Sequence, residues 1–439
     1  MSDSATLSTP ARPRFSAILA DRRIWLMLGF GFASGLPLPL SGFTLRMWLS
    51  EGHVSLGLIG ATASIGLAYS LKFLWAPIFD NRAIGVLERF GRRRGWLLTI
   101  QPLLTIACLL IVLASPTAPT ALIVFAALLA FCSASQDTVI DAWRIDTFPQ
   151  AMQGTALAAY IWGYRAALLI SGGAAIALAT PLGWHGVFVL MAALTLLGPL
   201  VTLLAPEPRA DASVAHMVAD HLSFRERFTR SVAEPLAEFV RRRGAGVILL
   251  FVVLFRLGEA LAGTMLPSLY HHLGFNRAQI ALANGPISLV SVLLGAALGG
   301  FLVARIGTGR ALLITGGFQS LCMLMYFALS YTAGAHHMLM ATAVVESFAD
   351  GLTDAAFITY LSSLCSRAHS ATQYALLSSI AALPLRTVAS LSGTMAAALG
   401  WHAFYAMTAL ATLPSIAVMV YLLKHYPPEK RRPGDGETA

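Results

Sequence analysis

The feature that most constrains this chain is a series of apolar blocks, each about twenty residues long, which fill most of its length. About twenty residues is the length that a helix needs to cross a hydrocarbon core of roughly 30 Å. One or two such blocks would indicate a soluble domain with an anchor, but here only short polar segments separate them. We therefore predict an all-α protein that crosses the membrane many times.

The composition agrees with this prediction. Only 12% of the residues are charged and 57% are hydrophobic, whereas a soluble domain carries roughly 25% charged residues. Helices are required because backbone groups in lipid must be hydrogen-bonded internally, and the blocks are too long and continuous for barrel strands. The expected helices are twelve: 24–49, 57–79, 96–114, 120–143, 154–180, 185–205, 246–270, 279–304, 311–331, 337–361, 373–397 and 402–424.

The formal net charge is +9, and the basic residues gather in alternate loops and at both ends. Basic loops stay cytoplasmic, so we predict an even number of spans and two cytoplasmic termini. Arg277 is the clear exception, because it lies in a loop on the other side. The expected order is a cytoplasmic segment (1–23), a six-helix half (24–205), a cytoplasmic linker (206–245), a second six-helix half (246–424) and a cytoplasmic tail (425–439).

The two halves share an internal repeat. One D-x-x-x-D-A motif begins at Asp137 and another at Asp350. In the next block of each half an arginine, Arg165 or Arg386, precedes a Ser-Gly pair, and Leu-Gly-Trp-His follows. Matches in this order indicate two parallel halves related by an axis along the membrane normal, the arrangement of major facilitator carriers. In such carriers the substrate binds near midplane between halves that rock around it.

Ionisable side chains within the apolar blocks are candidate functional residues, because each costs at least about 2.5–3.5 kcal/mol to insert. We expect Asp137 or Asp141 to pair with Arg165, and Asp350 or Asp354 to pair with Arg386. Arg256 and Glu259 lie three residues apart and can pair with each other. The candidates for the substrate or proton pathway are Lys72, Gln136, Asp137, Asp141, Arg165, Arg256, Glu259, Glu346, Asp350, Asp354 and Arg386.

Three interpretations of these acid–base pairs stay open. They are structural pairs between neighbouring helices, or a gate that breaks and reforms, or sites where a carboxylate binds the coupling proton or touches substrate. Lys72 and Arg46 have two interpretations as well. Either side chain can extend to the membrane interface or help to receive an anionic substrate.

Gly35, Pro37 and Pro39 interrupt the first expected helix, because proline removes a backbone donor. Ser34 and other polar neighbours are placed to bond the freed carbonyls or to line a cavity. Pro267 lies near the corresponding place in the seventh expected helix. We therefore expect the first helix of each half to be irregular.

No motif of an enzyme is present: the sequence has no P-loop, nucleophile elbow, metal-ligand cluster or nucleotide fingerprint. The four cysteines are scattered and indicate packing. A nucleic-acid site would need an exposed basic face, which the loop charges do not form. We predict a monomer that is not an enzyme, without cofactor or metal, whose partners are a small solute, protons and the lipid bilayer.

Several segments of the first half resemble the muropeptide permease (AmpG) family of Gram-negative bacteria, a branch of the major facilitator superfamily. The second half resembles that family in helix pattern and residue types. The segments that carry the resemblance are Phe32–Pro37, Leu71–Pro77, Gly91–Leu98, Phe131–Asp137, Asp141–Trp143 and Gly163–Arg165.

The resemblance implies proton-driven import of N-acetylglucosaminyl-1,6-anhydro-N-acetylmuramyl peptides across the bacterial inner membrane, for cell-wall recycling. By position it marks Gln136, Asp137 and Asp141 as functional. Some members of the family are longer, with two additional helices, and shorter relatives include siderophore importers. A carrier of the same fold for another bulky solute, such as a siderophore, is therefore the alternative, and a membrane sensor without transport is a third hypothesis.

Overall fold

The computed structural model describes residues 20–81, 85–149, 152–208, 241, 244–364 and 370–425. Within these ranges every regular element is a helix. Most of the expected N-terminal segment, most of the expected linker and all but the first residue of the expected tail lie outside the described residues. Cys365, one of the four cysteines, also lies outside them.

The first half is a bundle whose helices are often divided into short consecutive pieces. Its elements are α2 (Arg22–Gly35), α3 (Pro37–Leu40), α4 (Phe43–Glu51), α5 (Leu56–Ala61), η1 (Thr62–Gly66), α6 (Leu67–Leu71), η2 (Lys72–Leu74), α7 (Ala76–Asn81), η3 (Gly85–Phe90), α8 (Arg92–Leu113), α9 (Pro119–Thr147), α10 (Gln153–Leu168), η5 (Leu169–Ala174), α11 (Ala175–Thr195) and α12 (Leu197–Leu204).

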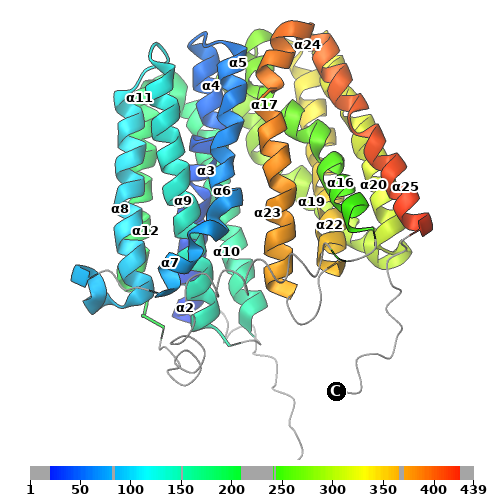
Figure 1. The fold of residues 1–439 in the computed structure, drawn as a ribbon. Coiled ribbons are helices and arrows are strands. Elements are labelled where there is room, and N and C mark those ends of the chain that lie inside the picture. The colour runs from blue at the N-terminus through cyan, green and yellow to red at the C-terminus, as the bar shows by residue number, and fades with distance from the viewer. Residues whose placement is uncertain are drawn as a thin grey trace, which may run out of the picture.

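The second half forms a second bundle beside the first (Figure 1). Its elements are α16 (Ala245–Phe255), α17 (Leu257–His272), α18 (Arg277–Leu282), η7 (Ala283–Ile287), α19 (Ser288–Ile306), α20 (Thr308–Cys322), α21 (Leu324–Leu329), α22 (His336–Ser363), α23 (Ser370–Ala389), α24 (Ser392–Leu410) and α25 (Leu413–His425).

Nine helical segments of the described ranges are long and apolar enough to cross a membrane. Two of them, Gln153–Leu204 and Ser392–His425, contain a sharp break at Gly183 (φ 68°) and at Gly400 (φ 75°). Glycine adopts such positive φ values without steric cost. These two glycines belong to the repeated Leu-Gly-Trp-His motif, so the motif marks an equivalent turn in each half.

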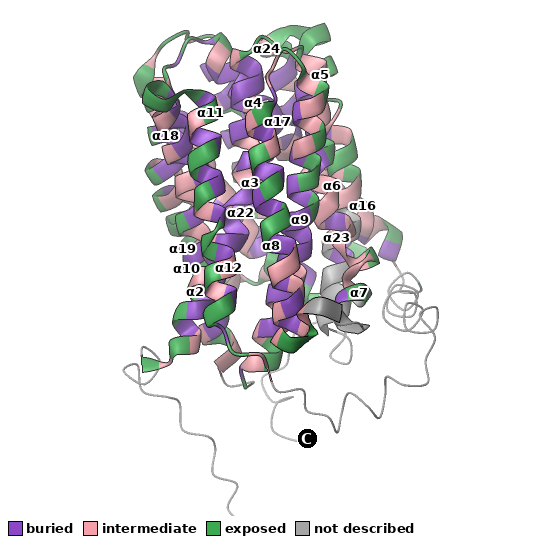
Figure 2. Cartoon of the chain, turned by 90° about the vertical axis from the view of Figure 1, so that its left-hand side faces the viewer, coloured by how far each residue is buried: buried purple, intermediate pink, exposed green. Residues whose placement is uncertain are grey.

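The outer faces of the bundles are apolar along their length. Figure 2 shows exposed positions following the outward faces of the helices, and many of them are large hydrophobic side chains such as Leu113, Trp162 and Leu410. Exposed apolar surface on this scale marks an interaction site on a soluble protein. On a bundle of spanning helices it is the surface that contacts lipid.

The first helix is interrupted, as predicted. The helix ends at Gly35, restarts with Pro37 at the first position of α3, and breaks again at Gly42. The first helix of the second half is irregular too, but not at Pro267, which lies within the continuous helix α17. The break falls at Arg256, between α16 and α17.

Glycines let α2 and α10 approach closely. A Cβ on Gly163 would overlap the carbonyl oxygen of Leu28, and a Cβ on Gly31 would overlap that of Tyr160. We expect Gly163→Ala to lower the free energy of unfolding by about 3 kcal/mol, because the backbone atoms of α2 that the new methyl group would meet cannot move aside. Gly154→Ala, on the same helix with open space around it, is expected to raise it by up to about 1 kcal/mol.

Thermal unfolding of the two purified variants in detergent measures this difference. Equal stabilities would contradict the close contact between α2 and α10.

Candidate functional site

A cavity of about 460 Å³ lies between the two halves. Its volume falls within the range of about 300–1,000 Å³ found for small-molecule sites. The first half contributes residues of α3, α4, η1, α6, α10 and η5 to its walls, and the second half contributes residues of η7, α19, α22 and α23. Because both halves line it, any movement of one half against the other changes its shape.

Three arginines, Arg46 of α4, Arg165 of α10 and Arg386 of α23, line this cavity, and we call them the arginine wall. The Nε atom of Arg46 is buried and has no hydrogen-bond partner. The charges of Arg46 and Arg386 lie close enough to repel each other. Within the described part of the chain, none of the three forms an ion pair within 4.0 Å. Unpaired guanidinium groups facing a shared space are suited to bind anions, carboxylates above all.

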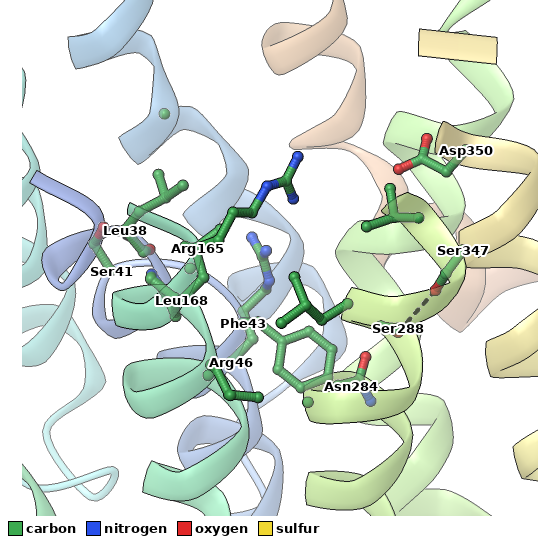
Figure 3. Close-up of a pocket in the computed structure, with 18 of the residues that line it drawn as sticks. Leu38, Ser41, Phe43, Arg46, Arg165, Leu168, Asn284, Ser288, Ser347 and Asp350 are labelled. Atoms are coloured by element: carbon green, nitrogen blue, oxygen red, sulfur yellow. Dashed lines mark hydrogen bonds between the residues drawn. The ribbon is translucent and has the colours of Figure 1, made fainter. Parts of the chain in front are cut away.

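The opposite wall is polar and acidic. Glu346 and Asp350 of α22 line it together with Asn284, Ser288 and Ser347. Figure 3 shows Arg46 and Arg165 on one side of the cavity and Ser288, Ser347 and Asp350 on the other; the hydroxyls of Ser288 and Ser347 lie 2.7 Å apart. The cavity therefore has a cationic wall and an acidic wall with hydroxyl and amide groups between them.

The carboxylates of α22 pair with an arginine other than the expected one. Arg256 lies 2.7 Å from Glu259 and 3.8 Å from Asp350, and its Nη1 atom also bonds Asp354. The expected pairing of Asp350 or Asp354 with Arg386 is therefore wrong. The helix break at Arg256 turns this guanidinium towards α22, while Arg386 lies over Gly66, where a side chain would overlap it.

The two acids of the first half have different surroundings. Asp141 lies 3.7 Å from Arg144 on its own helix, so the expected pairing of Asp141 with Arg165 is not formed. Asp137 forms no ion pair within the described part of the chain, with Arg165 or any other residue, and its Oδ1 atom is buried without a hydrogen-bond partner. Lys72 of η2 acts on Asp137 electrostatically without forming an ion pair.

The residues predicted at the helix break lie beside Asp137. Gln136 donates a hydrogen bond of 3.0 Å to the carbonyl of Ala33, at the end of α2. A Cβ on Gly35 would overlap the carbonyl oxygen of Tyr164, so this glycine permits close packing on α10. Ser34 is buried, and Pro37 begins α3. The described cavity wall begins one residue later, at Leu38.

Sequence reasoning missed the neutral residues of the cavity. Phe43, Tyr69, Asn284, Ser288 and Ser347 all line it. Uncharged side chains carry little signal in an apolar sequence, because serine and tyrosine occur throughout the helices. Asn284 lies within the π segment η7, and Tyr69 lies in the short helix α6 between two 3₁₀ segments. The Asn-Gly-Pro sequence that begins at Asn284 was the available signal for the first, and Tyr69 had none.

The two halves are joined at one end by an ion pair. Glu51, the last residue of α4, accepts hydrogen bonds of 2.9 and 2.6 Å from Arg277, the first residue of α18. Trp184 donates to the same carboxylate at 2.6 Å, and Arg277 also donates to the carbonyl of Ala179. This contact accounts for the one basic residue that departed from the loop-charge pattern. We call it the end latch.

Paired glycines bring the halves together near the end latch. A Cβ on Gly393 of α24 would overlap the backbone of α5 at Leu56, and Gly60 lies against Gly393. Gly173 and Gly285 meet in the same way between η5 and η7. Figure 1 shows α4, α5 and α24 together at the end opposite to α2. The structure is therefore closed at this end.

The Gly-Arg-Arg-Arg motif organises the other end of the first half. The carboxylate of Glu207 accepts hydrogen bonds from the backbone N–H groups of Arg93 and Arg94 at the start of α8. A carboxylate at a helix N-terminus complements the helix dipole. Arg93 also bonds Asp146 at 2.8 Å, which ties α8 to the end of α9.

Comparison with known proteins defines the class. The family model described as Major Facilitator Superfamily matches residues 53–384 and 248–439. Solved structures show the same fold: a bacterial homologue of the lysosomal transporter Spinster (TM-score 0.68, 14% identity, covering 95% of this chain and 98% of that one) and the nucleoside transporter NupG (TM-score 0.67, 14% identity, 92% and 98%). This chain belongs to the major facilitator superfamily.

Similar proteins identify the branch of the superfamily to which the chain belongs. The anhydromuropeptide permease of Escherichia coli strain K12 is 36% identical over 410 residues, which cover 93% of this chain and 81% of the relative. Putative transporter AmpG 4 of Rickettsia conorii is 31% identical over 412 residues, covering 93% and 98%. The chain belongs to the AmpG-type muropeptide permeases, and is a multi-pass inner-membrane protein and not an enzyme.

Proposed function

We propose that this protein imports anhydromuropeptides (GlcNAc-anhydroMurNAc-peptides) together with protons by alternating access, for cell-wall recycling. In this proposal twelve helices cross the inner membrane of a bacterium and both termini are cytoplasmic. The protein works as a monomer, since each chain holds a complete cavity between its own halves. The identity to the Escherichia coli permease supports the cargo.

The arginine wall is the observation that carries the proposal. An anhydromuropeptide joins a disaccharide to a peptide that bears carboxylates. Arginine binds carboxylates through two parallel hydrogen bonds, so Arg46, Arg165 and Arg386 are suited to hold the peptide. Asn284, Ser288 and Ser347 offer the groups that sugar hydroxyls and N-acetyl groups bond.

The closed end supports alternating access. We assign the end latch to the periplasmic side, because α2 begins at the opposite end of the molecule (Figure 1) and the basic residues predict a cytoplasmic N-terminus. The structure then represents an inward-facing form. Import requires the end latch to open, the cavity to receive cargo, and the end latch to reform.

Uptake of labelled anhydromuropeptide into proteoliposomes tests the proposal. An imposed inward proton gradient is expected to drive accumulation, and excess unlabelled anhydromuropeptide is expected to compete with it. The same disaccharide without its peptide keeps a single carboxylate, on its lactyl group, and should compete less well than the form whose peptide carries several. Accumulation of a ferric siderophore, with no uptake of anhydromuropeptide, would contradict the assignment of cargo but not of fold.

A further inference from the structure

A second polar cluster lies inside the first half, behind the cavity wall. It contains Ser34 of α2, Tyr69 of α6, and Ser133 and Asp137 of α9. Each has a buried side-chain oxygen with no hydrogen-bond partner in the described chain. Ser34 and Ser133 are 1% and 0% exposed. Ser34 lies near enough to act on Asp137, and Ser133 on Tyr69, but none of the four oxygens reaches hydrogen-bond geometry. Buried polar groups are nearly always paired, so this cluster calls for a functional explanation.

The groups around Asp137 do not neutralise it by direct contact. Lys72 acts on it electrostatically from η2, Asp141 from its own helix and Tyr160 from α10. Tyr69 and Tyr164 lie near it as well. The charged form of a carboxylate held without a paired cation inside a membrane is costly. The neutral acid avoids this cost and can donate a hydrogen bond to a neighbouring hydroxyl.

The repeat shows how unusual this is. Asp350 occupies the corresponding position of the second half, and its Oδ1 atom is also buried without a hydrogen-bond partner, but the guanidinium of Arg256 lies 3.8 Å from it. Within the described first half, no cationic side chain forms an ion pair with Asp137. The two aspartates are equivalent in sequence pattern but differ in the charge that faces them.

Tyr69 and Ser41 connect the cluster to the cavity. Both line the cavity, and Tyr69 lies beside Ser41, Ser133 and Asp137. The hydroxyl of Tyr69 is itself buried. It therefore stands between the carboxylate and the space where cargo binds.

We propose that Asp137 is the residue that takes up and releases the coupling proton, and that the Tyr69 side chain separates it from the cavity. This inference rests on the proton-coupled transport proposed above. A proton from water enters at Asp137 Oδ1 and converts the carboxylate to a carboxylic acid. When the halves rearrange, the acid returns the proton to water on the other side, and the charge of Lys72 stabilises the carboxylate that remains.

Asp137→Asn tests this in proteoliposomes by comparing two modes of transport. Uptake driven by the proton gradient is expected to fall at least tenfold, towards the level seen without a gradient. Exchange of labelled for unlabelled anhydromuropeptide, which needs no net proton movement, should persist. Asp21→Asn is the control: it also removes one carboxylate from the first half, and asparagine is as good an N-cap for α2. Gradient-driven uptake by Asp137→Asn at the wild-type level would overturn the proposal.

Infrared difference spectra of the purified protein give a readout that does not depend on transport. Titration from about pH 5 to 9, a range in which buried carboxyls titrate, should reveal a protonated carboxyl band in the wild type that Asp137→Asn lacks. Absence of that band would overturn the inference whatever the cargo. Wild-type exchange without any response to the proton gradient would refute the coupling itself.

Tyr69→Phe provides a second variant with little risk to folding. Removing the hydroxyl is expected to shift the pH dependence of gradient-driven uptake, while Tyr405→Phe, which also loses a buried unpaired hydroxyl, should not shift it. Equal effects of the two variants would count against a role for Tyr69.

Discussion

Arg46→Gln is expected to reduce uptake of anhydromuropeptide at least about 30-fold while making the purified protein more stable. A hydrogen bond to a charged group contributes about 1.5–3 kcal/mol, and every 1.4 kcal/mol is about tenfold in affinity. Losing one arginine–carboxylate contact of about 2 kcal/mol therefore predicts this size of effect. Initial rates of uptake in proteoliposomes over a range of cargo concentrations measure it.

The gain in stability follows from the arginine wall itself. Arg46 repels Arg386, and in the protein alone no carboxylate lies within ion-pair distance of either in the described chain. Removing one charge is expected to add about 1 kcal/mol to the free energy of unfolding, by relief of repulsion at an effective dielectric constant of about 20. Thermal unfolding in detergent measures the change. If Arg46 served packing instead of binding, Arg46→Gln would lower both the free energy of unfolding and the uptake.

Two control variants distinguish the effect of the charge of Arg46 from the effect of its side-chain geometry and from a general effect of losing one positive charge. Arg46→Lys keeps the charge but loses the planar fork, and should recover only part of the uptake. Arg305→Gln removes an equal charge at the end of α19, where Arg305 lies over the ring of Phe301, and should leave uptake unchanged. Wild-type uptake by Arg46→Gln would show that this arginine does not contact the cargo.

Glu51→Gln is expected to open the closed end of the molecule. It removes the carboxylate charge that holds Arg277 at 2.6 Å and weakens the contact with Trp184. The pair is partly exposed, so its loss should cost the closed form about 2 kcal/mol, less than a fully buried pair. An equilibrium between two conformations then shifts about 30-fold towards the outward-open form.

Distances between spin labels report this shift directly. Thr117 and Ala333 are exposed residues in loops of the two halves, and cysteines there can carry the labels after the native cysteines are replaced. We expect the population with a long distance to grow in Glu51→Gln and to remain small in Asp21→Asn. The swap Glu51→Arg with Arg277→Glu should restore part of the closed population. An unchanged distance distribution would mean that the glycine contacts alone close this end.

Much of the architecture could be predicted from local sequence. Blocks of about twenty apolar residues have one solution in lipid, so the helices and their approximate ends follow from composition. The Leu-Gly-Trp-His repeat predicted where two helices meet in each half, and Gly183 and Gly400 provide those turns. The interrupted first helix followed from Pro37 and its neighbours, because proline lacks the backbone donor that a helix needs.

The sequence by itself determined which charged residues lie within the membrane and which of them share a helix face, because helical periodicity is a local property. Only the tertiary structure decided their partners. Arg256 and Asp354 are far apart in the chain and meet because a helix break turns the arginine towards α22. The same motif therefore leaves Asp350 beside a guanidinium and Asp137 without one. An ion pair depends on which helix packs alongside, and periodicity along one helix carries no information about its neighbour.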